Sequence, residues 1–298
     1  MTYIGISHLT ATEMVILNCV PDGEKDTANQ LAALIDGRAF FRLGKEVAVV
    51  RCHTSAQLIA TLQAILARAQ QGAMPMLHLD GHASAEVMAT AGGETVTWDE
   101  VYSWFRRINI ECRNNLFVSL GACEALRSFD RSTITLPCPV NALLAAWDPV
   151  LAAVVEVGLE AFYGTLFGSL GDVNAALNAM RSVVAPCPLL FFTSKNYLEK
   201  GMMGYVREHC IGDGLRARIA SVASEARRQH PEIVITDELA TRVMRDEVTH
   251  TPAVLREMAC RFMHIRTDGV NLDRFGEDLA AILETAQIEL NREPLMGR

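Results

Sequence analysis

Two side chains that could form a nucleophilic pair lie just beyond predicted strands. His82 follows the apolar run 76–79 by a short turn, and Cys123 follows the run 116–120, 41 positions later in the chain. A thiol attacks a carbonyl carbon efficiently only as a thiolate or with a base at hand. An imidazole titrates near neutrality, so it can accept the thiol proton and later protonate a leaving amine. The pair therefore predicts acyl transfer.

The elements that must position this pair are those of an α/β sheet. Short β-type runs alternate with helical patterns over the first two thirds of the chain, which is typical of a mostly parallel sheet flanked by helices. The expected strands are 15–20, 47–51, 76–79, 116–120, 140–146 and 189–192, and the expected helices are 26–35, 54–71, 98–108, 150–166 and 173–184. Ligands of such sheets bind beyond the carboxyl ends of the strands. If strands 76–79 and 116–120 are neighbours, His82 and Cys123 face one crevice.

The pattern changes after about residue 195. From there on, helical periodicity with frequent Arg and Glu extends over 215–228, 239–246 and 275–291. The sequence therefore predicts an α/β domain over residues 1–195 and a C-terminal helical region over residues 196–298, to which no role is assigned.

Composition narrows the classes of partner. The formal net charge of −8 argues against a phosphate-binding surface, so no nucleic-acid partner is expected. The longest apolar stretch, 140–159, is interrupted by polar residues and does not predict a membrane span. The first residues do not resemble a signal peptide, so a cytoplasmic location is expected. The eight cysteines contain no C-x-x-C pair, which predicts neither a metal site nor a disulfide framework.

Three motifs carry a resemblance to a known family. One strand ends in the segment 80–83, Asp-Gly-His-Ala, and a later strand ends in the segment 121–123, Gly-Ala-Cys. A helix then carries Phe-Tyr-Gly-Thr-Leu at 162–166, followed by the alanine-rich segment 172–179. In these features the chain resembles the caspase-like clan of cysteine peptidases, and within it the bacterial CHAT group. The likeness covers roughly residues 12–193.

The resemblance implies roles for individual residues. It makes His82 the catalytic histidine and Cys123 the nucleophile, with an oxyanion hole formed by the backbone N–H groups of Cys123 and Ala83. The family has glycine where this chain has Ala83. The glutamine of the caspase signature is replaced by Gly121, so cleavage after aspartate is not implied. The resemblance also implies a protein substrate, no metal or organic cofactor, and activity held back until a separate activating protein or a cleavage event intervenes.

Acidic residues near the pair suggest a substrate preference. Asp80 and Glu124 flank the two reactive residues, and Asp148 follows the expected strand 140–146. These carboxylates would select a basic side chain by charge pairing. The alternative is that they are solvated turn residues. His78, inside a predicted strand, is interpreted as a hydrogen-bonded core residue.

Three functions are compatible with the sequence. The first is a thiol endopeptidase acting through His82 and Cys123, and the presence of both residues favours it over a module without activity. The second is a caspase-like module that has lost activity and binds peptides or assembles with other proteins, since a fold alone does not guarantee chemistry. The third is another thiol enzyme, such as a transferase, that uses the same pair.

Overall fold

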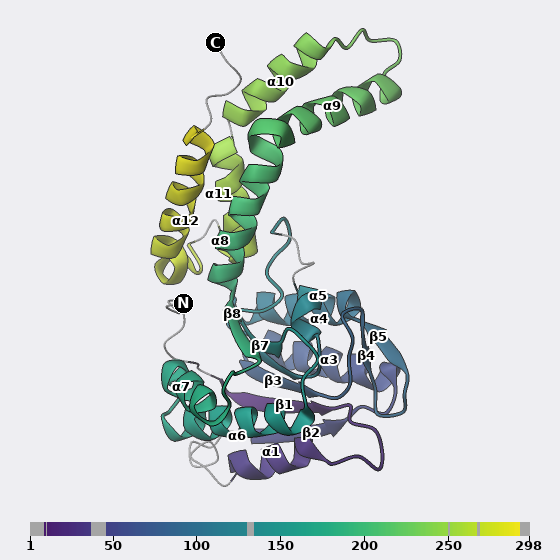
Figure 1. The fold of residues 1–298 in the computed structure, drawn as a ribbon, viewed down its shortest axis with the longest axis vertical. Coiled ribbons are helices and arrows are strands. Elements are labelled where there is room, and N and C mark those ends of the chain that lie inside the picture. Colours follow the sequence, from purple (N-terminus) through teal and green to yellow (C-terminus); the bar gives the residue numbers. More distant parts are fainter. Residues whose placement is uncertain are drawn as a thin grey trace. The chain divides into compact units, whose positions relative to one another are not determined.

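The chain forms two compact units in the computed structural model (Figure 1). The structure describes residues 9, 11–36, 46–129, 134–249, 251–266 and 269–292. The first unit, called here the sheet unit, spans Met1–Ser132 and Cys138–Ser194. The second, the helical unit, spans Thr133–Pro137 and Lys195–Arg298.

The sheet unit is built on six strands in the order β2-β1-β3-β6-β7-β8. All neighbouring pairs are parallel except β7 and β8, which are antiparallel. The predicted mixed α/β fold with a central, mostly parallel sheet is therefore confirmed. The strands are β1 (Glu13–Asn18), β2 (Glu46–Arg51), β3 (Pro75–Asp80), β6 (Phe117–Gly121), β7 (Ala142–Ala146) and β8 (Leu189–Thr193).

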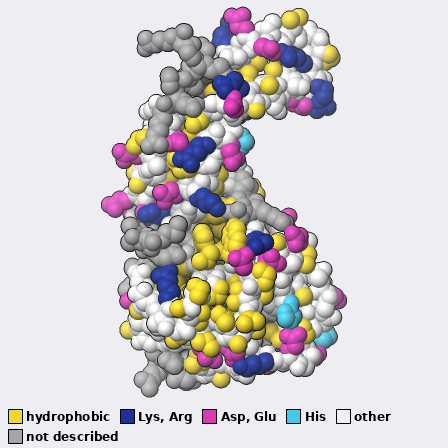
Figure 2. All heavy atoms as spheres, in the orientation of Figure 1, with side chains coloured by type: hydrophobic (Ala, Val, Ile, Leu, Met, Phe, Trp, Pro, Cys, Tyr) yellow, Lys and Arg dark blue, Asp and Glu magenta, His cyan; other side chains and the backbone are white. Residues whose placement is uncertain are grey.

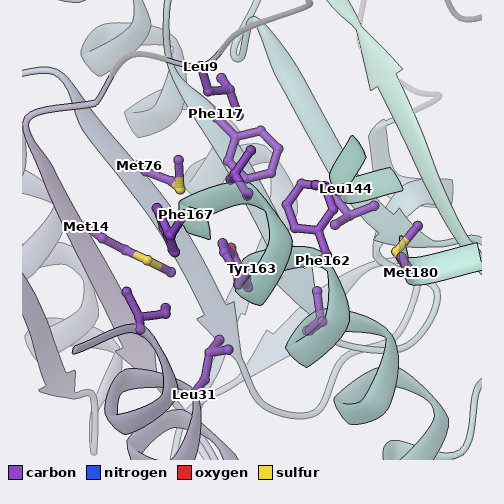
Figure 3. Packing of buried hydrophobic residues seen from close by; sticks show 14 of the residues in the cluster. Leu9, Met14, Leu31, Met76, Phe117, Leu144, Phe162, Tyr163, Phe167 and Met180 are labelled. Atoms are coloured by element: carbon purple, nitrogen blue, oxygen red, sulfur yellow. The ribbon is translucent and has the colours of Figure 1, made fainter. Parts of the chain in front are cut away.

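Helices cover both faces of this sheet. One face carries α1 (Thr27–Asp36), α6 (Ala152–Gly168) and α7 (Val173–Val183), whose apolar side chains form one buried cluster with the strands. Figure 3 shows Phe162 and Tyr163 among these side chains, between the strands and the helices. Side chains alternate along a strand, so Val15 and Leu17, also buried, point to the opposite face. There α3 (Ser55–Gln70) packs beside α4 (Trp98–Glu111).

The predicted start of α3 shows how the sequence sets one boundary. Thr54 accepts a hydrogen bond from the backbone N–H of Gln57, and the Gln57 side chain accepts one from the Thr54 backbone N–H, which completes a capping box. Leu58, Leu62 and Ile65 then lie on the buried face of the helix.

Three elements of the sheet unit were not predicted. A small antiparallel hairpin, β4 (Val87–Ala89) with β5 (Thr95–Thr97), lies between the third strand and α4. A short helix, α5 (Ala125–Phe129), begins two residues after Cys123. Each has only three to five residues, which is too short for a periodic apolar pattern to develop.

The described part of the helical unit is made of helices. Its elements are α8 (Ser194–Tyr205), a π-helical turn η1 (Val206–Cys210), α9 (Gly212–Gln229), α10 (Asp237–Thr249), α11 (Thr251–Phe262) and α12 (Leu272–Arg292). A small apolar cluster joins Leu215 and Ile219 of α9 to Met244 of α10. In the described parts of the chain, no helix is long and apolar enough to span a membrane.

Candidate active site

The register of the sheet brings His82 and Cys123 to the same edge. β3 and β6 are parallel neighbours, and Asp80 of β3 pairs with Gly121 of β6. His82 and Cys123 each lie two residues beyond this last pair. Since adjacent strands are about 4.8 Å apart, both residues leave the sheet at the same level. The expectation that the two strands are neighbours is confirmed.

Both side chains line one pocket of about 500 Å³. Its walls come from the β1–α1 connection, α1, the ends of β3 and β6, the β7–α6 connection and the first half of α6. Figure 2 shows hydrophobic side chains gathered on the visible face of the sheet unit, with acidic side chains at the borders of this group. The lining residues other than His82 and Cys123 are Val20, Glu24, Lys25, Thr27, Gln30, Leu31, His78, Asp80, Gly81, Gly121, Ala122, Val150, Leu151, Ala152, Ala153, Val155, Glu156, Leu159 and Glu160.

The two reactive side chains form their hydrogen bonds with other groups. Nε2 of His82 lies 2.9 and 3.1 Å from the two carboxylate oxygens of Glu24. The thiol of Cys123 donates to the backbone carbonyl oxygen of Val150, at 3.5 Å. Within the described residues, no hydrogen bond joins the thiol to the imidazole, and Nδ1 of His82 has no partner. Direct proton transfer between them therefore requires the thiol to leave its partner and the two side chains to approach each other.

Cys123 lies in a sharp turn between a strand and a helix. β6 ends at Gly121, α5 begins at Ala125, and Glu124 between them has a φ of 54°. A residue other than glycine in this left-handed region costs free energy, and such positions concentrate at functional sites. The backbone N–H groups of Cys123 and Ala83 have no hydrogen-bond partner in the part of the chain described. Cys123 lines the pocket, whereas Ala83 does not.

Glycine at two positions permits the close approach of neighbouring groups. A Cβ atom on Gly81 would lie 2.9 Å from the Cβ atom of Cys19, at the end of β1. A Cβ atom on Gly121 would lie 2.9 Å from Oδ1 of Asp80 and 3.4 Å from Nε2 of His78. The immediate role of these two glycines is therefore to let the strand ends pack closely together.

Two polar side chains form the buried end of the pocket. Asp80 is 8% exposed and accepts a hydrogen bond from the hydroxyl of Thr27. Burial raises the pKa of Asp80 to about 6, and the nearby carboxylates Asp26 and Glu156 act in the same direction. The hydrogen bond from Thr27 and the charge of His82 oppose this shift.

His78 is the second buried polar residue. Its Nδ1 lies 2.6 Å from the hydroxyl of Ser119, which in turn hydrogen-bonds the hydroxyl of Tyr163. Burial lowers the pKa of His78 to about 3, so the imidazole is neutral. The interpretation of His78 as a hydrogen-bonded core residue is confirmed.

The acidic residues predicted to bind substrate fall into two groups. Asp80 lines the pocket, but Glu124 and Asp148 do not. Both of the latter form ion pairs with Arg127 of α5, whose guanidinium also donates to the carbonyl oxygen of Trp147. Sequence reasoning missed Glu24 and Glu156, which lie far from His82 and Cys123 in the sequence but line the same pocket.

A second pocket in the described chain lacks cysteine and histidine side chains of the kind found in the pocket of Cys123. A larger pocket of about 630 Å³ lies over β1, β2 and α3, but no cysteine, serine or histidine lines it. Among the described residues, no group of three or more histidine, cysteine, aspartate or glutamate side chains is arranged to hold a metal ion.

Comparisons with known proteins give one kind of similarity. No protein-family model matches the chain, and a search among curated proteins gives no match. Among solved structures, the chain is similar to caspase-1 from Spodoptera frugiperda, with 11% sequence identity and a TM-score of 0.43. The similarity covers 63% of this chain and 88% of that one. At this level it does not decide activity.

Proposed function

We propose that this protein is a cysteine endopeptidase in which Cys123 is the nucleophile and His82 the general base. The observation that supports this most strongly is that both side chains line one pocket and that each residue lies two positions beyond the paired ends of β3 and β6. The resemblance to the bacterial CHAT group extends the proposal to a regulated effector protease that acts on protein substrates.

In the proposed mechanism, Nδ1 of His82 takes the thiol proton as Sγ of Cys123 attacks the scissile carbonyl carbon. The resulting oxyanion is held by the N–H of Cys123, with the N–H of Ala83 as the second proposed donor. The C–N bond then breaks, and His82 returns the proton to the leaving amine. Water, deprotonated by His82, hydrolyses the thioester and regenerates the thiol.

Glu24 is the proposed positioning residue for His82. Its carboxylate contacts Nε2, so it can fix the ring orientation and stabilise the imidazolium formed during the reaction. This arrangement leaves Nδ1 as the nitrogen available to the thiol. Cys123 must release the carbonyl oxygen of Val150 to meet it.

This required rearrangement supports the proposed separate activating protein. Because both side chains are engaged elsewhere, a partner that moves the segment around Val150 would release the thiol. Full turnover by the purified chain alone would contradict this part of the proposal. Absence of turnover with intact peptide binding would favour the second function, an inactive peptide-binding module.

The test is cleavage of a peptide library by the parent chain and two variants. Cys123→Ala is expected to abolish cleavage, and His82→Ala to lower kcat by a factor of about 100 to 10,000, as for the loss of a general base. Matched controls are Cys260→Ala and His230→Ala, which alter the same residue types in the helical unit. If the Cys123 and His82 variants cleave as well as the parent, the assignment is wrong.

A further inference from the structure

The pocket beside Cys123 carries an excess of negative charge. Four carboxylates line it, and one ammonium group, that of Lys25, accompanies them. Lys25 forms an ion pair with Glu156, and Glu24 is engaged by His82. The two remaining carboxylates, Asp80 and Glu160, have no ion-pair partner in the described part of the chain.

Asp80 is the carboxylate at the buried end. Oδ2 accepts the hydrogen bond from Thr27, whereas Oδ1 lies beside Gly121 and has no hydrogen-bond partner among the described residues. A carboxylate that is nine-tenths buried is costly without a cation or further donors. A cationic group entering the pocket would supply what is missing.

The walls of the pocket suit the rest of such a group. Apolar side chains from the β1–α1 connection, α1, the β7–α6 connection and α6 line the same pocket as Asp80, namely Val20, Leu31, Val150, Leu151 and Leu159. Lysine and arginine bury their methylene stems along apolar surface while their charged ends reach a polar partner. This combination of apolar walls and a terminal carboxylate distinguishes the pocket from a merely acidic surface.

We infer that this pocket is a subsite for an arginine or lysine side chain of the substrate, with Asp80 as its anionic partner. The inference rests on the proposed function, because it takes Cys123 as the group that reacts beside the bound residue. Of the three acidic residues that the sequence suggested for binding a basic side chain, only Asp80 belongs to this subsite. Glu124 and Asp148 already form ion pairs with Arg127.

The test uses peptides that differ only in the residue before the scissile bond. Arginine is compared with citrulline, which has nearly the same shape without the charge, and with leucine and aspartate. For the full-length parent, kcat/KM is expected to be at least about tenfold higher for arginine than for citrulline. Asp80→Asn should remove most of this ratio, whereas Glu111→Gln, which removes a carboxylate at the end of α4, should not.

A pH series adds an independent readout. Asp80 faces Asp26, Glu156 and His82, and its carboxyl group ionises as the pH rises through about 6. The arginine-to-citrulline ratio should therefore grow between pH 5 and pH 7 in the parent and change less in Asp80→Asn. Equal cleavage of the arginine and citrulline peptides by the parent would overturn the inference even if Asp80→Asn failed to fold.

Binding separates this inference from the proposed function. Fluorescence anisotropy of the labelled arginine and citrulline peptides is measured on the Cys123→Ala chain. If the parent cleaves no peptide, but Cys123→Ala binds the arginine peptide at least about tenfold more tightly than the citrulline peptide, the subsite stands and the peptidase proposal fails. If Cys123-dependent cleavage is found without preference for arginine, the peptidase proposal stands and the subsite fails. Equal binding without cleavage contradicts both.

Discussion

The contact between Glu24 and His82 gives a prediction for a single residue. Glu24→Gln is expected to lower kcat for a neutral citrulline peptide about tenfold, because the imidazolium loses its anionic partner, while KM stays unchanged. A neutral substrate is chosen so that the loss of one pocket charge does not alter binding. Glu24→Asp should recover part of the rate. A change in KM alone, with kcat intact, would contradict a positioning role.

Asp80 gives a prediction for the pH dependence of stability. Its pKa is about 6 in the folded chain, above the ordinary value of 3.8. Between these values the folded state keeps a proton that the unfolded state has released, so this residue lowers the free energy of unfolding as the pH rises. From pH 4 to pH 7, Asp80→Asn should gain up to about 3 kcal/mol relative to the parent.

Urea unfolding of the parent and of Asp80→Asn at each pH measures this difference. The gain should be confined to the range between pH 4 and about pH 6 and should level off above it. If the free energies of unfolding of the two chains differ by the same amount from pH 4 to pH 7, the pKa of Asp80 is not raised by folding.

At the residue scale, the sequence predicted the site residues that directly follow a strand and missed those that reach the site from distant parts of the chain. His82 and Cys123 could be found because each follows an apolar strand by a fixed short turn. Glu24 could not, because its contact with His82 spans 58 positions and depends on how the β1–α1 connection lies over the pocket. Asp148 was expected to bind substrate because its ion pair with Arg127 is a tertiary contact, which the sequence does not reveal.

The turn between β6 and α5 gives a prediction for an element. Glu124 has a φ of 54° there, where glycine is free of strain and alanine is not. Glu124→Gly and Glu124→Ala both remove the ion pair with Arg127, so they form a matched pair. The glycine variant is expected to be more stable by about 1 kcal/mol. Equal stability, or a more stable alanine variant, would mean that the turn is not strained.

At the scale of elements, hydrophobic periodicity predicted the long helices and the strands of the main sheet. The predicted strands and the helices of the sheet unit all correspond to elements of the structure, with boundaries shifted by a few residues. The antiparallel direction of β8 could not be predicted, because an apolar run looks alike in parallel and antiparallel strands. The helices α8 and α11 and the turn η1 were not predicted individually, although the helical character of the region was expected.

At the scale of the whole molecule, the cysteines differ in their surroundings. Five of the eight, all in described segments, are buried: Cys19, Cys52, Cys112, Cys138 and Cys210. Burial raises the pKa of Cys112 and Cys138 to about 12, which makes these thiols poor nucleophiles. Of the three partly exposed cysteines, Cys187 and Cys260 lie outside the pocket and Cys123 lines it.

The most direct measurement is therefore the rate at which a peptidyl acyloxymethyl ketone labels each cysteine, followed by mass spectrometry of the intact chain and its peptides. The account predicts one adduct per chain, on Cys123, and a labelling rate that falls about 100-fold or more in His82→Ala, where the base is lost. Labelling of Cys187 or Cys260 as fast as Cys123, or a rate at Cys123 that does not change without His82, would contradict it.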